Sequence, residues 1–175
     1  MSKTNIRSDF PILATSSRGK PLTYLDNAAT TQKPQCVIDK IGDYYATFNA
    51  NVHRAAHEMA EKATAELERT RESCAKFLNA KSTNEIIFTK GTTESINLVA
   101  NSVPLFSEKR RNIVISELEH HSNIVPWQLV AERHNLGVRA IGISDEGELD
   151  LNQARSLINE DTALVAITHV SNGLG

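Results

Sequence analysis

The stretch NIVISELEHHSNIVPWQLVAERHNLGVRAIGI, Asn112 to Ile143, predicts the fold class of this chain. Within it, NIVIS (112–116) and VRAIGI (138–143) are short and mostly apolar, which is typical of buried strands. Between them, NIVPWQLVAERHN (123–135) has Pro126 in its first turn and predicts a helix. A strand, a helix and a second strand in this order predict a parallel β-α-β unit.

The same alternation extends to both sides of this unit. Two further strands are predicted, EIIFT (85–89) and ALVAITHV (163–170). Four further helices are predicted: 36–48, 57–78, 93–106 with an interruption at Pro104, and 151–159. Apolar strands that alternate with helices predict an α/β fold, with a mostly parallel sheet covered by helices on both faces.

The two ends of the chain differ from this pattern. Residues 1–22 are predicted to form an irregular N-terminal arm, and TYLD (23–26) a short extended piece. At the other end, SNGLG (171–175) follows the last predicted strand directly. Because a parallel strand normally runs into a helix that covers it, we expect the fold to be incomplete at the C-terminus, with the rest supplied by further sequence or by another chain.

Composition excludes several classes of function. The 175 residues carry 19 Lys and Arg against 21 Asp and Glu, so no basic excess predicts binding to nucleic acid. No apolar run reaches the roughly 18 residues of a membrane span, and the N-terminus has no signal-peptide core. Cys36 and Cys74 lie in helical patterns and not in a CxxC spacing. We expect both to be buried or half-buried helix residues in a cytoplasmic protein.

The segment KGTTES, Lys90 to Ser95, follows a predicted strand and opens a helix. Free backbone N–H groups and the positive end of the helix dipole favour an anion at such a position. Gly91 lets a ligand approach the backbone, and the hydroxyls of Thr92 and Thr93 can donate hydrogen bonds to phosphate oxygens. Taken alone, the motif is more often a Thr cap without a ligand. It lacks the GxxxxGK[ST] pattern of a Walker loop.

Two histidines and a carboxylate occur together in EHHSN, Glu119 to Asn123, which is a composition typical of metal ligands. In extended backbone, however, His120 and His121 point to opposite faces, so they are poorly placed to bind one ion. We therefore expect no metal site. An imidazole beside a phosphate cradle could instead stack on a flat aromatic cofactor. The alternative is a helix-entry histidine held by local hydrogen bonds.

Five segments occur in the order found in a known family and cover nearly the whole chain. They are YLDNAATTQKP (24–34), NVHRAAH (51–57), FTKGTTESINLVA (88–100), EHHSNIVPWQ (119–128) and ITHVSNGLG (167–175). Together they resemble the N-terminal part of the cysteine desulfurases of the NifS/SufS type, and most closely the SufS-like branch. These are class V aminotransferase relatives that use pyridoxal 5'-phosphate (PLP). The resemblance implies the large domain of the aspartate-aminotransferase-like PLP enzymes, with residues 23–175 as its N-terminal part.

The resemblance also implies roles for individual residues. Thr92 and Thr93 would bind the PLP phosphate, and His121 would stack on the pyridine ring and move protons as the catalytic residue. Asn172 would lie near the ring hydroxyl and the substrate carboxylate. Four further residues are implied near the substrate entrance or the dimer interface: Ala28, Ala29, His53 and Arg54. At Gly173 the chain reads SNGLG, where the family usually reads SNVLG or SNxxG.

The activity implied is conversion of L-cysteine to L-alanine. The sulfur would pass as a persulfide to a sulfur-acceptor protein or iron–sulfur scaffold, and the full-length enzyme would be a homodimer. The family's Schiff-base lysine and nucleophilic cysteine have no counterpart in these 175 residues, so we expect the chain alone to be inactive. Two alternatives stay open. One is a selenocysteine lyase or another class V relative, and the other is a catalytically dead truncated paralogue that acts only by binding.

Overall fold

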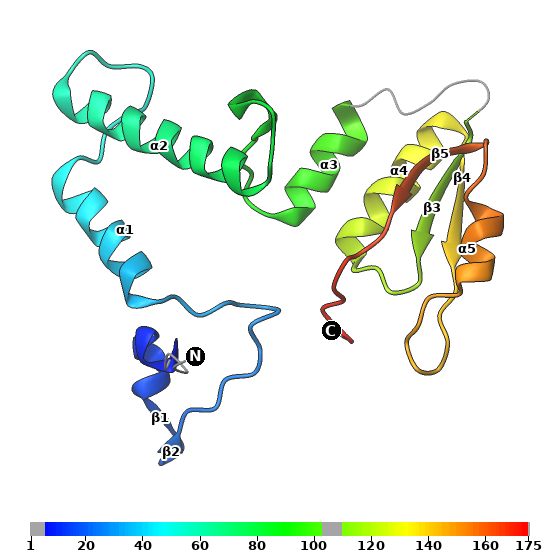
Figure 1. Ribbon diagram of the computed structural model, residues 1–175, viewed down its shortest axis with the longest axis horizontal. Helices are drawn as coiled ribbons and strands as arrows, with labels where there is room; N and C mark the ends of the chain where they lie inside the picture. Colours follow the sequence, from blue (N-terminus) through cyan, green and yellow to red (C-terminus); the bar gives the residue numbers. More distant parts are fainter. Residues whose placement is uncertain (1–5, 103–109, 175) are drawn as a thin grey trace. The chain divides into compact units, whose positions relative to one another are not determined.

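The computed structural model describes residues 6–102 and 110–174, which form two compact units that meet in sequence between Ile87 and Phe88 (Figure 1). The predicted interruption at Pro104 lies outside the described residues. In the parts of the chain described, no helix is both long enough and apolar enough to cross a membrane.

The first unit consists of short elements followed by two helices. Its elements are η1 (Ile6–Asp9), η2 (Pro11–Ala14), β1 (Ser16–Ser17), β2 (Lys20–Pro21), α1 (Gln35–Thr47), α2 (Glu58–Phe77) and η3 (Thr83–Glu85). β1 and β2 pair in antiparallel fashion within the predicted arm. The helices predicted over 36–48 and 57–78 are confirmed, and the His57 side chain caps α2 by accepting from the Ala60 N–H at 3.3 Å.

The second unit is an α/β layer. Its elements are α3 (Thr92–Ser102), β3 (Asn112–Ser116), η4 (His121–Asn123), α4 (Val125–His134), β4 (Gly137–Ile141), α5 (Leu151–Leu157) and β5 (Thr162–Ala166). The three strands form a parallel sheet in the order β4-β3-β5, with Ile113 opposite Val138 on one side and Leu164 on the other. The parallel α/β prediction is therefore confirmed, including the β-α-β unit over 112–143.

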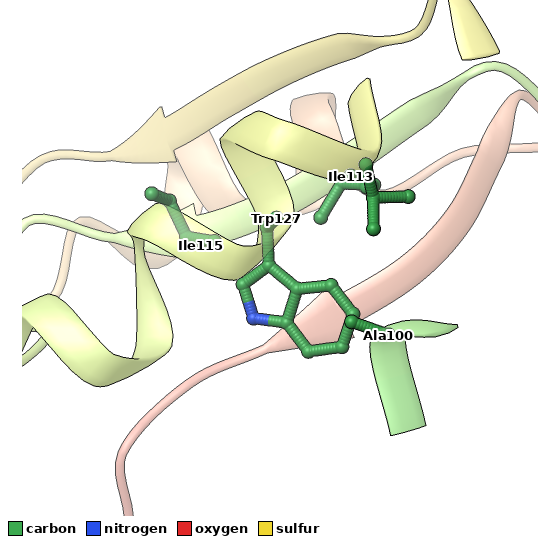
Figure 2. Close-up of a cluster of buried hydrophobic side chains, with 5 residues drawn as sticks. Ala100, Ile113, Ile115 and Trp127 are labelled. Atoms are coloured by element: carbon green, nitrogen blue, oxygen red, sulfur yellow. The ribbon is translucent and has the colours of Figure 1, made fainter. Parts of the chain in front are cut away.

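The core of the second unit lies between β3 and the helices α3 and α4. Trp127 of α4 is 3% exposed and packs with Ile113, Ile115, Val130 and Ala100. Figure 2 shows four of these side chains together, with the indole of Trp127 among the aliphatic groups. Pro126 begins α4 because its missing N–H costs nothing in the first turn, and Asn135 ends the helix in a left-handed conformation with φ of 53°.

The opposite face of the sheet is also covered. Side chains alternate along a strand, so Val114 faces away from Ile113 and Ile115, yet Val114 is fully buried. β4 and β5 lie on opposite sides of β3, so the two crossovers run in opposite directions across the sheet. Right-handed crossovers then place α4 and α5 on opposite faces. Figure 1 shows these two helices on either side of the strands.

Three local predictions are wrong. EIIFT (85–89) does not form a strand. Glu85 closes η3, and the Ile86 carbonyl accepts from Arg71 Nη1 at 2.6 Å rather than from a neighbouring strand. The strand predicted over 163–170 ends at Ala166, because the Thr168 N–H donates to a carboxylate rather than to a neighbouring strand. Cys36 is exposed on α1, whereas Cys74 is half-buried.

Candidate functional site

The candidate site lies in the second unit, where the parallel strands β3 and β5 end. Their carboxyl ends meet at the same edge of the sheet, which is where ligands collect in α/β folds. β3 leads into the segment that carries His120 and His121, and β5 leads towards Asn172. The third contributor is the N-terminus of α3, which carries Thr92 and Thr93.

The N-terminus of α3 is open. Gly91 has a φ of 156°, which residues with a Cβ rarely adopt. Apart from its chain neighbours, no described residue has an atom within 4 Å of the position a Cβ would occupy. Ahead of the helix, the Lys90 N–H donates to Glu94 Oε2 at 2.6 Å, so a carboxylate rather than a threonine bonds the entering backbone. Within the described residues, the hydroxyls of Thr92 and Thr93 make no hydrogen bond.

The two histidines have different surroundings. His120 Nδ1 accepts from the Ser122 N–H at 3.1 Å and lies 2.9 Å from Ser122 Oγ, so His120 is the locally bonded helix-entry histidine. His121 is exposed, and its ring makes no hydrogen bond to any residue the structure describes. The ring centroids are 5.9 Å apart at an interplanar angle of 61°. Of the pair, His121 is therefore the one whose ring is available to a ligand.

Two hollows share this pair of histidines. The Thr93 hollow has a volume of about 300 Å³, and Thr93, Asn97 and Ser122 line it together with both histidines. The Asn172 hollow has a volume of about 400 Å³, and its wall includes Glu119 and Asn172 beside the same two histidines. Three of the predicted cofactor residues, Thr93, His121 and Asn172, thus line two hollows that have His121 in common.

Directly before the histidines in the sequence lies a buried carboxylate, Glu119, whose structural role the sequence did not reveal. Glu119 is 8% exposed and accepts three hydrogen bonds: from Ser116 Oγ at 2.5 Å, Asn123 Nδ2 at 2.7 Å and the Thr168 N–H at 2.8 Å. The available signal was the spacing of Glu119, Asn123 and Trp127, four residues apart along a helix entry. The sequence by itself suggests for Glu119 only the role of a metal ligand.

The residues predicted on the substrate side belong to the first unit. Ala28 and Ala29 are exposed in a turn, and Arg54 is exposed in the loop before α2. His53 has a φ of 59°, and its Nε2 lies 3.2 Å from Glu68 Oε1 of α2. Their roles at the substrate entrance stay predictions.

The donors at the site suit one class of ligand. The first N–H groups of a helix have no intrahelical acceptor, and at α3 they are accompanied by two hydroxyls and an open glycine. An imidazole lines the same hollow as Thr93. This set fits a phosphate joined to a flat ring. Among residues 6–102 and 110–174, no three His, Cys, Asp or Glu side chains are grouped so that they could hold a metal ion.

Comparison with known proteins gives consistent results. The aminotransferase class-V family matches residues 23–175. The chain is 48% identical over 171 residues to a cysteine desulfurase of Pectobacterium atrosepticum, an alignment that covers 97% of this chain and 42% of that protein. The chain therefore spans less than half the length of this curated relative.

Solved structures agree with the sequence comparison. The apo structure of a cysteine desulfurase from Thermococcus onnurineus matches with a TM-score of 0.82 and 39% identity, over 97% of this chain and 40% of that one. A cysteine desulfurase from Escherichia coli matches with a TM-score of 0.78 and 34% identity, over 95% of this chain and 41% of that one.

Proposed function

Since the chain belongs to the aminotransferase class-V family, we propose that it binds PLP and serves in a cysteine desulfurase. The reaction would remove sulfur from L-cysteine and leave L-alanine. The sulfur would pass as a persulfide to an acceptor protein or iron–sulfur scaffold. The observation that carries the proposal is that His121 lines both the Thr93 hollow and the Asn172 hollow.

Each end of the cofactor has candidate partners in this chain. The free N–H groups of α3 and the hydroxyls of Thr92 and Thr93 would donate hydrogen bonds to the phosphate, and the positive end of the helix dipole would offset its charge. The imidazole of His121 would lie on the ring face and fix its tilt. The Asn172 amide would donate a hydrogen bond to the ring hydroxyl or the substrate carboxylate. When bound, PLP supplies an electron sink for the charge that develops on the substrate.

His121 has a second proposed role. Its exposed ring nitrogens make no hydrogen bond within the described residues, so they are available to accept or donate a proton at the substrate. His120 is a poorer candidate, since its Nδ1 is already bonded to Ser122. This difference favours the second histidine of the pair for both stacking and proton transfer.

We also propose that the protein is a cytoplasmic homodimer, by analogy with the family the sequence resembles. Within the described chain, Cys36 and Cys74 are both free thiols, which suits a reducing compartment. Sedimentation of the purified protein would test the dimer, and a monomer at micromolar concentration would contradict it.

The cofactor proposal is tested by titration of PLP into cofactor-free protein, prepared as its source cell produces it. His121→Ala is expected to weaken PLP binding about tenfold, because stacking of a base on an aromatic side chain contributes on the order of 1–3 kcal/mol. His134→Ala, an exposed histidine at the end of α4, is the matched control and should bind PLP normally. Unchanged affinity in His121→Ala would refute the stacking role. Formation of L-alanine from L-cysteine tests the activity.

A further inference from the structure

We propose that Glu119 is a positioning residue whose buried carboxylate joins the two walls of the Asn172 hollow. One wall carries His121, and the other is the segment that runs from β5 to Asn172. The three hydrogen bonds that Glu119 accepts, here called the clamp, all lie within the second unit. The consequence of the clamp for PLP rests on the proposed function.

The three donors to Glu119 come from three different segments. Ser116 ends β3 and Asn123 ends η4, whereas Thr168 follows β5 and lies 49 residues after Glu119. Oε1 accepts from Ser116 and Thr168, while Oε2 accepts from Asn123. A buried carboxylate is costly unless donors compensate it, so these bonds strongly favour one arrangement of the three segments.

Trp127, in the apolar core, determines which group of Asn123 donates to Glu119. The Trp127 indole can only donate, and its Nε1–H donates to Asn123 Oδ1 at 2.8 Å. This bond orients the Asn123 amide, so its NH₂ group must face Glu119. Position 119 must therefore present an acceptor at both of its polar atoms.

A glutamine at position 119 cannot meet this requirement. If its oxygen keeps the bonds from Ser116 and Thr168, its NH₂ group faces the NH₂ group of Asn123. Turning the Asn123 amide over does not help, because its NH₂ group would then face the donor of Trp127. Glu119→Gln thus keeps size and shape but places two donors against each other.

The clamp bears directly on the candidate ligand-binding residues. His121 lies between Glu119 and Asn123, so its backbone is held on both sides by one carboxylate. Asn172 lies four residues after Thr168, whose N–H the same carboxylate accepts. Loss of the clamp should therefore loosen both walls of the hollow while the apolar core around Trp127 remains.

The test is a reciprocal swap in the protein as its source cell produces it. Glu119→Gln and Asn123→Asp each break the pattern, the first with two facing donors and the second with two facing carboxylates. The double variant restores it, since the amide introduced at position 119 would then donate to the carboxylate introduced at position 123, which also accepts from Trp127. The net charge of the double variant equals that of the original protein. Glu132→Gln, on the exposed side of α4, is the matched control.

PLP affinity and the fluorescence of Trp127, the only tryptophan among these 175 residues, are the two readouts. Each single variant should weaken PLP binding about tenfold and shift the emission, and the double variant should return both to within about twofold of the original. Normal PLP affinity in Glu119→Gln, or a double variant no better than the singles, would overturn the proposal.

The swap also distinguishes failure of the clamp from failure of the proposed function. If the original protein does not bind PLP, the proposed function fails, and the swap is then read from Trp127 fluorescence and melting temperature alone. Recovery in the double variant supports the clamp in that case, and no recovery overturns it. If Glu119→Gln does not fold, a double variant that folds supports the clamp, and one that also fails to fold overturns it.

Discussion

The two units bury their apolar residues to very different extents. All five residues of β3 are buried, whereas α1 has thirteen residues and none of them is buried. Both segments have the apolar pattern expected of their secondary structure. Periodicity therefore specifies the element, whereas burial depends on a second element that packs against it.

In the first unit, the packing between α1 and α2 is incomplete. α1 and α2 line an apolar hollow of about 460 Å³, where the rings of Tyr44 and Phe48 meet edge to face with their centroids 5.1 Å apart. Phe48, which follows α1 directly, is 3% exposed, but Ile41 within the helix is 53% exposed. In the second unit, Trp127 and its aliphatic neighbours fill the space between β3 and the helices α3 and α4. Substitutions should therefore have unequal effects in the two units.

The largest expected effect is that of Trp127→Ala. Removing a buried indole should lower the free energy of unfolding by about 3–5 kcal/mol, because it leaves a cavity and an Asn123 acceptor without its donor. Ile41→Ala should change it by no more than about 0.5 kcal/mol, as is usual for exposed positions. Urea unfolding of both variants, followed by circular dichroism, compares the two. Equal losses would contradict the contrast between the units.

A smaller effect is expected from two glycines of the second unit. Gly147 has a φ of 84°, and a Cβ there would lie 2.7 Å from Leu174 Cδ1, so Gly147→Ala should cost about 1–2 kcal/mol. Gly173 does not have a positive φ, and its Cβ would lie 3.7 Å from Ser171 Oγ, an ordinary contact. Gly173→Ala should stabilise by about 0.4–1 kcal/mol. Thermal unfolding of both variants tests the pair, and a destabilising Gly173→Ala would show that this turn needs glycine.

The sequence predicted the elements of the second unit well because each is locally determined. NIVIS matches β3 residue for residue, and Pro126 marks the start of α4. The sequence predicted EIIFT wrongly because a strand also needs a partner, and a partner is not a local property. It overestimated the burial of Cys36 for the same reason, since helical spacing does not identify what covers a face.

The candidate site was predictable to a similar degree. The clusters at Thr92 and His121 stand out because polar residues at strand ends and helix starts are visible in the sequence. The bond from Thr168 to Glu119 joins residues far apart in the chain, so no local pattern could reveal it. What the sequence lacked was the topology that brings β5 beside β3.

The smallest expected effect is electrostatic and lies in the first unit. The hydrogen bond from Arg69 holds the pKa of Glu66 below its usual value of 4.5, and Lys40 adds to this at 3.6 Å. A lowered folded-state pKa stabilises the fold above the unfolded-state pKa, and this contribution is lost as the pH falls through the folded-state value. Arg69→Gln should raise the pKa of Glu66 towards 4.5, as measured by carboxyl-carbon NMR titration.

Lys40→Gln is the matched control for this titration and should raise the pKa of Glu66 less than Arg69→Gln does, because the Arg69 bond is the larger cause. Arg69 and Glu66 lie three residues apart on α2, so their interaction needs one helical turn and no core. The Glu66 shift should therefore persist in Ile41→Ala, which removes apolar area from α1. A Glu66 pKa that moved as far in Ile41→Ala as in Arg69→Gln would mean that even this local pair depends on packing between the helices, and the contrast between the units would weaken.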